Sequence, residues 1–260
     1  MGSAVFLLRN GTANHHHQVG KNFYTNPGAM AWALFDQDVL MYRKIPAAYG
    51  IKQFRQVRVN ERGEYVEGGY LLLPNQLQPA IAAAALPGFG EVHRRYMQNF
   101  PRVGGTYAIL DDENTGEIVL DASGNPVFRY TVRGRDKLKT RDFLKKSASV
   151  LLAAGAREVL IPSSPPLLIR ETREIPAIDS LSLAPGTMVF GGPHLLATCR
   201  RGEDITRCVT DSYGESHEIK NLFIVDGSSL PGSVSVDPSL TIMAFSSQTA
   251  QYVNEHWPMP

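Results

Sequence analysis

The residues with the clearest chemical potential lie near the carboxyl terminus, where an apolar segment and a loop of small residues lead toward a helix. Asp237 and Pro238 are typical of a helix start, as the N-cap residue and the first helical residue. The unpaired N–H groups at such a start, together with the helix dipole, favour a bound anion. Gly232 and Ser233 in the preceding loop would let a ligand approach the backbone closely. Taken alone, these residues are more simply interpreted as ordinary strand, turn and cap residues.

Other recognisable kinds of site are missing from the sequence. It contains no G-x-S-x-G elbow, no G-x-x-x-x-G-K-[ST] phosphate loop and no G-x-G-x-x-G motif. Cys199 and Cys208 form no C-x-x-C pair, so neither a structural zinc site nor a disulfide framework is expected. The run from His15 to His17 could bind a metal, but no carboxylate or cysteine accompanies it. A polar loop is the preferred interpretation of that run.

Composition and charge limit the partners. The chain has 260 residues, of which 43% are hydrophobic and 20% are charged, so it can bury a substantial core. Its formal net charge is +1 and its basic residues are dispersed, which argues against nucleic acid. No apolar run approaches the roughly 18 to 20 residues of a transmembrane helix, and the first residues lack a secretory signal pattern. We therefore predict a cytoplasmic protein without a transmembrane segment.

The rest of the chain supplies strands and helices that would position the carboxyl-terminal residues. Hydrophobic spacing predicts helices at residues 78–86, 91–100 and 135–154. Strands are predicted at residues 30–35, 106–110, 117–120, 127–132 and 158–161, with a hairpin formed by 54–60 and 65–73. Three further predictions are a turn and apolar segment at 2–9, a long ordered connection at 161–193, and a buried strand at 221–228. The pattern indicates an α+β arrangement with a largely antiparallel sheet.

The carboxyl-terminal segment resembles the closing signature of the glucose-methanol-choline flavoprotein oxidoreductases. In that family a strand N-L-x-V-x-D-[GA]-S, a P-x-S loop and a helix opening with N-P-x-x-T-I follow one another. The corresponding residues here are 221–228, 231–233 and 237–242. Upstream, residues 194–202 resemble H-x-x-G-T-C-R-M-G, and the segments 2–9 and 19–22 resemble two motifs from earlier in the family's sequence. The spacing from Asp226 to Asp237 is similar to that of the cholesterol-oxidase-like and long-chain alcohol oxidase branch.

The resemblance implies that the protein is an FAD-dependent enzyme that oxidises the CH–OH group of an alcohol. In that family the flavin takes a hydride from the alcohol carbon. The resemblance further implies that His194 accepts the hydroxyl proton, a task that suits an imidazole with an ordinary pKa of about 6.5. Asp237 occupies the second catalytic position, which is Asn or His in relatives. An ionised carboxylate can accept a hydrogen bond but cannot donate one to the carbonyl product, so a role in helix capping alone stays equally open. The resemblance also places four residues beside the cofactor: Asp226, Gly227, Pro238 and Ser239.

The sequence departs from the family pattern at several points. Ala197 replaces a glycine, Arg201 replaces a methionine, and no β-α-β unit with G-x-G-x-x-G is present to hold FAD. We therefore expect a fragment whose FAD-binding half is a missing amino-terminal partner. The predicted organisation has three parts. Residues 1–30 are a remnant of the FAD-binding domain, residues 31–190 form a substrate domain with a mainly antiparallel sheet flanked by helices, and residues 191–260 are the closing segment of the incomplete FAD-binding domain. The fold class predicted for the whole chain is α+β or α/β.

Two functions remain open at this point. The first is oxidation of a small-molecule, hydrophobic alcohol when the missing half is supplied. The alternative is a non-catalytic remnant of the family that binds an apolar alcohol or sterol without turnover.

Overall fold

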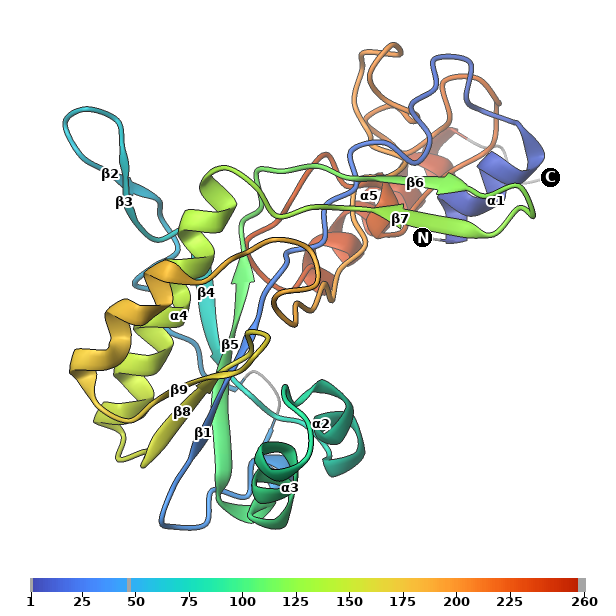
Figure 1. Ribbon diagram of the computed structural model, residues 1–260. Coiled ribbons are helices and arrows are strands. Elements are labelled where there is room, and N and C mark those ends of the chain that lie inside the picture. The colour runs from blue at the N-terminus through green and yellow to red at the C-terminus, as the bar shows by residue number, and fades with distance from the viewer. Residues whose placement is uncertain (1, 46–47, 257–260) are drawn as a thin grey trace. The chain divides into compact units, whose positions relative to one another are not determined.

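The computed structural model describes residues 2–45 and 48–256, which form two compact units (Figure 1). The first unit gathers residues 2–26, 111–131 and 192–256, and the second gathers residues 27–110 and 132–191. The stretch 111–131 therefore belongs to the same unit as the two ends of the chain, although sequence analysis assigns it to the substrate domain. The three-part division of the whole protein stays a prediction.

A five-stranded antiparallel sheet, ordered β4-β5-β1-β8-β9, forms the middle of the second unit. Its strands are β1 (Met30–Leu34), β4 (Tyr70–Pro74), β5 (Val103–Leu110), β8 (Glu158–Ile161) and β9 (Leu167–Ile169). The helices of this unit are α2 (Pro79–Ala85), α3 (Glu91–Gln98) and α4 (Arg135–Ala153), with the short 3₁₀ helices η1 (Met41–Arg43), η2 (Phe100–Arg102) and η3 (Thr172–Ser180). This arrangement confirms the predicted mixed fold with a mainly antiparallel sheet flanked by helices.

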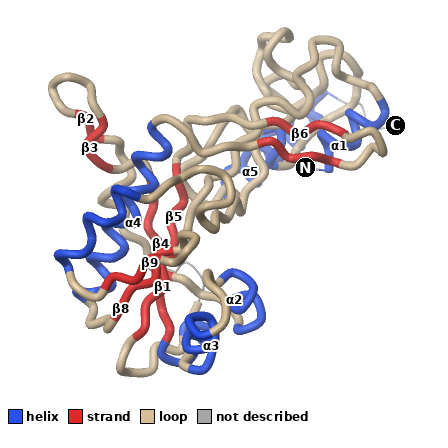
Figure 2. Tube along the Cα trace, in the orientation of Figure 1, coloured by secondary structure: helices blue, strands red, loops and turns tan. Residues whose placement is uncertain are grey.

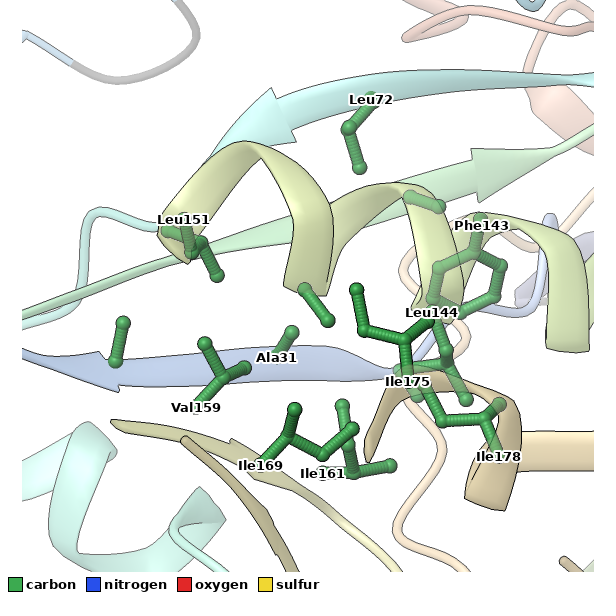
Figure 3. Close-up of a cluster of buried hydrophobic side chains, with 14 of the residues drawn as sticks. Ala31, Leu72, Phe143, Leu144, Leu151, Val159, Ile161, Ile169, Ile175 and Ile178 are labelled. Carbon is green, nitrogen blue, oxygen red and sulfur yellow. The ribbon is translucent and has the colours of Figure 1, made fainter. Parts of the chain in front are cut away.

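Helices cover both faces of this sheet because apolar side chains alternate along its strands. In β1, Ala31 and Ala33 belong to one apolar cluster, and Trp32 and Leu34 belong to another. The first cluster joins the sheet to α4 and η3, and Figure 3 shows Phe143 of α4 beside the sheet residues. The second cluster joins the opposite face to α2 and α3. Full burial of a side chain such as Phe143 contributes about 1.5–3 kcal/mol of stability.

The first unit has far less regular structure, as Figure 2 shows by the amount of loop. Its elements are α1 (Gly2–Asn10), β6 (Glu117–Leu120), β7 (Pro126–Arg129), η4 (Gly227–Ser229) and α5 (Ser239–His256). Strands β6 and β7 form a hairpin, and Ile118 of β6 packs with Val5 of α1. The predicted helix after Pro238 is thus present as α5.

Two predictions in the first unit are wrong. The segment predicted as a turn and apolar run at the amino end is the helix α1, in which Ala4 and Leu7 face one apolar cluster at helical spacing. The segment predicted as a buried strand, residues 221–228, forms no strand in the described chain. Its only bridge there joins Phe223 to Glu215, and Val225 is 41% exposed. A strand needs continuous ladder pairing along its backbone, and the other backbone hydrogen bonds of this segment do not extend that single bridge into a ladder.

Two predictions in the second unit need adjustment. The predicted hairpin is present as β2 (Arg58–Val59) with β3 (Tyr65–Glu67), but it is shorter than predicted. Gly68 and Gly69 both have left-handed backbone angles, and they redirect the chain so that the following residues join the large sheet as β4. The connection predicted at 161–193 contains β9 and η3.

Within residues 2–45 and 48–256, no helix has both the length and the apolar character needed to cross a bilayer.

Candidate active site

His194 is held in the first unit by backbone pairing on one side and a buried amide on the other. Two residues beyond it, Leu196 exchanges backbone hydrogen bonds with Tyr24, at 3.0 and 3.3 Å. The imidazole Nδ1 lies 2.9 Å from Asn26 Oδ1, and only 12% of the His194 side chain is exposed. Burial lowers the pKa of His194, and the neighbouring Asp237 carboxylate offsets part of that effect. The lowered pKa favours the neutral imidazole, the form that can accept a proton.

The structure brings His194 and Asp237 together. His194 Nε2 lies 3.4 Å from Asp237 Oδ1, and 52% of the Asp237 side chain is exposed. The adjoining Pro238 is buried, and its carbonyl accepts the first α5 hydrogen bond from Ile242, at 2.8 Å. An imidazole and a carboxylate thus lie side by side where α5 begins, which is the arrangement that the resemblance implies. The catalytic roles of both residues stay predictions.

The start of α5 fits one part of a flavin site. Because the first hydrogen bond in the helix is made by Ile242, the N–H groups of residues 239–241 have no partner within the helix. Ser239 and Leu240 are exposed. Free N–H groups and the positive end of an 18-residue helix suit a carbonyl oxygen or a ring that becomes negatively charged on reduction. Pro238 and Ser239 could hold FAD at this edge.

Asp226 and Gly227 have structural partners within the first unit. The Asp226 carboxylate accepts hydrogen bonds from Ser3 Oγ at 2.5 Å and from Ser228 N at 2.7 Å. Burial raises the pKa of Asp226, but these hydrogen bonds outweigh it, and the net shift is downward. The Gly227 carbonyl accepts a hydrogen bond from Ala197 N at 3.1 Å. Contact of either residue with a cofactor stays a prediction, and the carboxylate itself is already engaged by hydroxyl and amide donors.

Sequence reasoning missed two buried residues behind His194. Asn26 is fully buried, and its Nδ2 donates to Val234 O at 2.6 Å and to Ser233 Oγ at 3.0 Å. Asp112 is 3% exposed and accepts hydrogen bonds from Thr25 N, from Tyr130 Oη and, over a short contact, from Ser233 Oγ. Burial raises the pKa of Asp112, and these hydrogen bonds offset part of the rise.

No sequence spacing links these residues, because His194 and Asn26 are 168 positions apart. The one available signal was the position of Asn26 just beyond the family-like segment 19–22, directly before a proline.

The two departures from the family pattern have structural counterparts. Ala197 adopts a left-handed backbone angle, φ 62°, a conformation that glycine takes without strain. Arg201 is 5% exposed, donates to Ser212 O and Gln248 Oε1 at 3.2 Å each, and lies 4.6 Å from the ring centre of Phe245. The arginine thereby connects α5 to the loop before it.

The described residues contain no group of three or more potential ligands that could hold a metal ion. The Cys199 thiol is buried, which raises its pKa to about 12. It is therefore protonated at neutral pH and unsuited to nucleophilic chemistry.

Comparison with known proteins places these features in a family. The family model described as GMC oxidoreductase matches residues 112–246. An uncharacterised GMC-type oxidoreductase of Mycobacterium tuberculosis is 28% identical over 242 residues, which are 92% of this chain and 36% of that protein. A long-chain-alcohol oxidase of Arabidopsis thaliana is 26% identical over 254 residues, covering 92% of this chain and 33% of that protein. The chain thus spans about a third of the length of these curated relatives.

Among solved structures, the crystal structure of pyridoxine 4-oxidase from Mesorbium loti has the same fold. It aligns with a TM-score of 0.67 and 15% sequence identity, over 99% of this chain and 50% of that one.

Proposed function

The chain belongs to the GMC oxidoreductase family, and we propose that it contributes the proton-accepting part of an FAD-dependent enzyme that oxidises the CH–OH group of an alcohol. The observation that carries this proposal is the geometry of the His194 imidazole, whose Nε2 lies 3.4 Å from Asp237 Oδ1 where α5 begins. Bound FAD would supply the hydride acceptor for the alcohol carbon. His194 would take the hydroxyl proton, and the Asp237 carboxylate would stabilise the resulting imidazolium.

The substrate that we propose is a hydrophobic alcohol. The similarity to a long-chain-alcohol oxidase supports this class.

We further propose that a separate G-x-G-x-x-G segment holds the dinucleotide part of FAD and packs on the first unit. The support is an apolar groove of about 540 Å³ beside α5, lined by Phe223, Val225, Ala250 and Val253 among others. Val253→Asp should abolish association with a coexpressed dinucleotide-binding segment from a relative. Ile81→Asp is the matched control, because Ile81 is an exposed apolar residue of α2 in the other unit. Equal association of both variants would contradict the proposal.

The first test is the visible absorbance spectrum of the purified protein with FAD, recorded after unbound cofactor is removed, alone and with that segment. Flavin-loaded protein is then assayed for dye reduction with alcohols of increasing chain length. His194→Gln should lower kcat by about 10²- to 10⁴-fold, which is the usual contribution of general base catalysis. His217→Gln is the control, since His217 bonds to Gly202 O instead. Full activity of His194→Gln, or no alcohol oxidation by flavin-loaded protein, would refute the proposed function.

The role of Asp237 can be tested in the same assay. A carboxylate cannot donate a hydrogen bond to the carbonyl product, and an amide can. Asp237→Asn should therefore raise turnover if product polarisation limits the reaction. Lower turnover would instead show that the carboxylate assists by stabilising the imidazolium, and unchanged turnover would contradict both roles.

A further inference from the structure

We propose that Asn26 is a positioning residue that keeps a hydrogen on His194 Nδ1, so that Nε2 alone is available to accept a proton. The catalytic meaning of this proposal rests on the proposed function. The position of the hydrogen is a property of the chain itself and can be measured without cofactor or substrate.

The orientation of the Asn26 amide is decided by its neighbours. Its Nδ2 lies 2.6 Å from the carbonyl oxygen of Val234, which can only accept a hydrogen bond. The reversed amide would place Oδ1 at that same distance from the carbonyl, with no hydrogen between the two oxygens. Asp112 Oδ1, another acceptor, lies 3.5 Å from the same nitrogen. Asn26 Oδ1 therefore faces His194.

The hydrogen bonds beyond Asn26 run in one direction. Ser233 Oγ receives a hydrogen from Asn26 Nδ2 and donates its own to the Asp112 carboxylate. An ionised carboxylate can only accept hydrogen bonds, so the Ser233 hydroxyl must donate its hydrogen to Asp112 and accept one from Asn26 Nδ2. The amide oxygen of Asn26 is then left to accept from the imidazole. The chain of donors is His194 Nδ1–H to Asn26, Asn26 to Ser233, and Ser233 to Asp112. All of these groups lie in the first unit.

This polarity determines which imidazole nitrogen does the chemistry. Because Asn26 Oδ1 can only accept, His194 Nδ1 carries its hydrogen in both the neutral and the charged ring. In the neutral ring Nε2 then has a free lone pair, and the Asp237 carboxylate opposite it has no hydrogen to offer. A substrate hydroxyl is the donor that Nε2 lacks. In the reaction of the proposed function, Nε2 would take the proton as the alcohol O–H bond breaks, and bound FAD would supply the acceptor for the hydride that leaves the carbon as the C=O bond forms.

The test is a long-range ¹H–¹⁵N correlation spectrum of the full chain with ¹⁵N-labelled histidine, recorded above the histidine titration range. His194 is assigned through His194→Gln. The expected result is a protonated Nδ1 and an unprotonated Nε2 for His194. The spectrum has an internal control with the opposite expectation, because the ring of His217 meets a carbonyl, Gly202 O, through Nε2 at 2.8 Å. An Nε2–H tautomer or a mixture of tautomers for His194 in the wild-type protein would overturn the proposal.

Two variants make the test specific. Asn26→Leu has a similar volume but cannot accept a hydrogen bond, so the Nε2–H tautomer, which the Asp237 carboxylate favours, should predominate. Ser233→Ala leaves the Val234 contact that orients the amide, so His194 should keep its Nδ1–H tautomer. Unchanged His217 signals show that each variant is folded. A folded Asn26→Leu variant that retains the Nδ1–H tautomer would overturn the proposal, and if that variant does not fold, the wild-type spectrum decides.

Kinetics then separate this proposal from the proposed function. In flavin-loaded protein, Asn26→Leu should lower kcat by roughly 10²-fold, the low end of the general base contribution, with KM little changed. A correct tautomer in a protein that oxidises no alcohol would refute the proposed function and leave the assignment of the hydrogen intact. A shifted tautomer with undiminished kcat would refute the catalytic role of Asn26.

Discussion

The Asp112 carboxylate joins three distant parts of the first unit, and Tyr130→Phe tests how strongly it does so. Tyr130 Oη donates to Asp112 Oδ2 over 2.9 Å, and the carboxylate is 3% exposed. Hydrogen bonds to charged groups contribute about 1.5–3 kcal/mol. Because Tyr130 is only half-buried, the lower part of this range applies. The variant should therefore lose about 1.5–2 kcal/mol of unfolding free energy, a large fraction of the roughly 5–15 kcal/mol that stabilises a typical domain.

The assay is urea unfolding followed by far-ultraviolet circular dichroism. For a denaturant slope of about 2 kcal/mol/M, the expected loss lowers the unfolding midpoint by nearly 1 M without changing the slope. Tyr213→Phe is the matched control. Tyr213 is an exposed tyrosine of the same unit whose ring stacks on Tyr252, so its variant should stay within about 0.5 kcal/mol of the wild type. A Tyr130→Phe variant as stable as this control would refute the view that Asp112 organises the unit.

Three further predictions concern stability. Burial lowers the pKa of the His194 imidazole, so the unfolded chain protonates at a higher pH than the folded protein does. The stability that the neutral imidazole contributes is present above pH 6.5 and is lost as the pH falls through the folded pKa. His194→Gln should therefore show a smaller loss of stability between pH 7.5 and pH 5.5 in urea unfolding. Ala197→Gly relieves the strain of a left-handed backbone angle, so it should be about 1 kcal/mol less destabilising than Ala244→Gly, which places a glycine at an exposed position of α5. Equal losses of unfolding free energy in denaturant would contradict this. Arg201→Ala should cost about 2–4 kcal/mol, while Arg201→Met, which keeps the volume without a buried charge, should cost less. Equal drops in the calorimetric melting temperature would instead show that the lost hydrogen bonds of the guanidinium dominate, since both variants lose them.

Sequence determined the elements whose signals are local. The helical spacing of apolar residues located α4, and a proline at a helix start located α5 within a residue. The motif-like spacing also singled out His194 and Asp237, which lie next to each other in the structure. These signals can be read from sequence because the residues that produce them are only a few positions apart.

Only the tertiary structure decided how those elements are used. The helix α1 depends on apolar partners that residues far along the chain provide, and the segment 221–228 lacks the continuous backbone pairing that a strand requires. The hydrogen-bond chain from His194 through Asn26 and Ser233 to Asp112 joins residues 168, 207 and 121 positions apart at its successive steps. The direction of that chain depends on which acceptor each amide and hydroxyl meets, and the path of the folded backbone fixes this. A sequence names the donors and acceptors, but only the fold determines which of them pair.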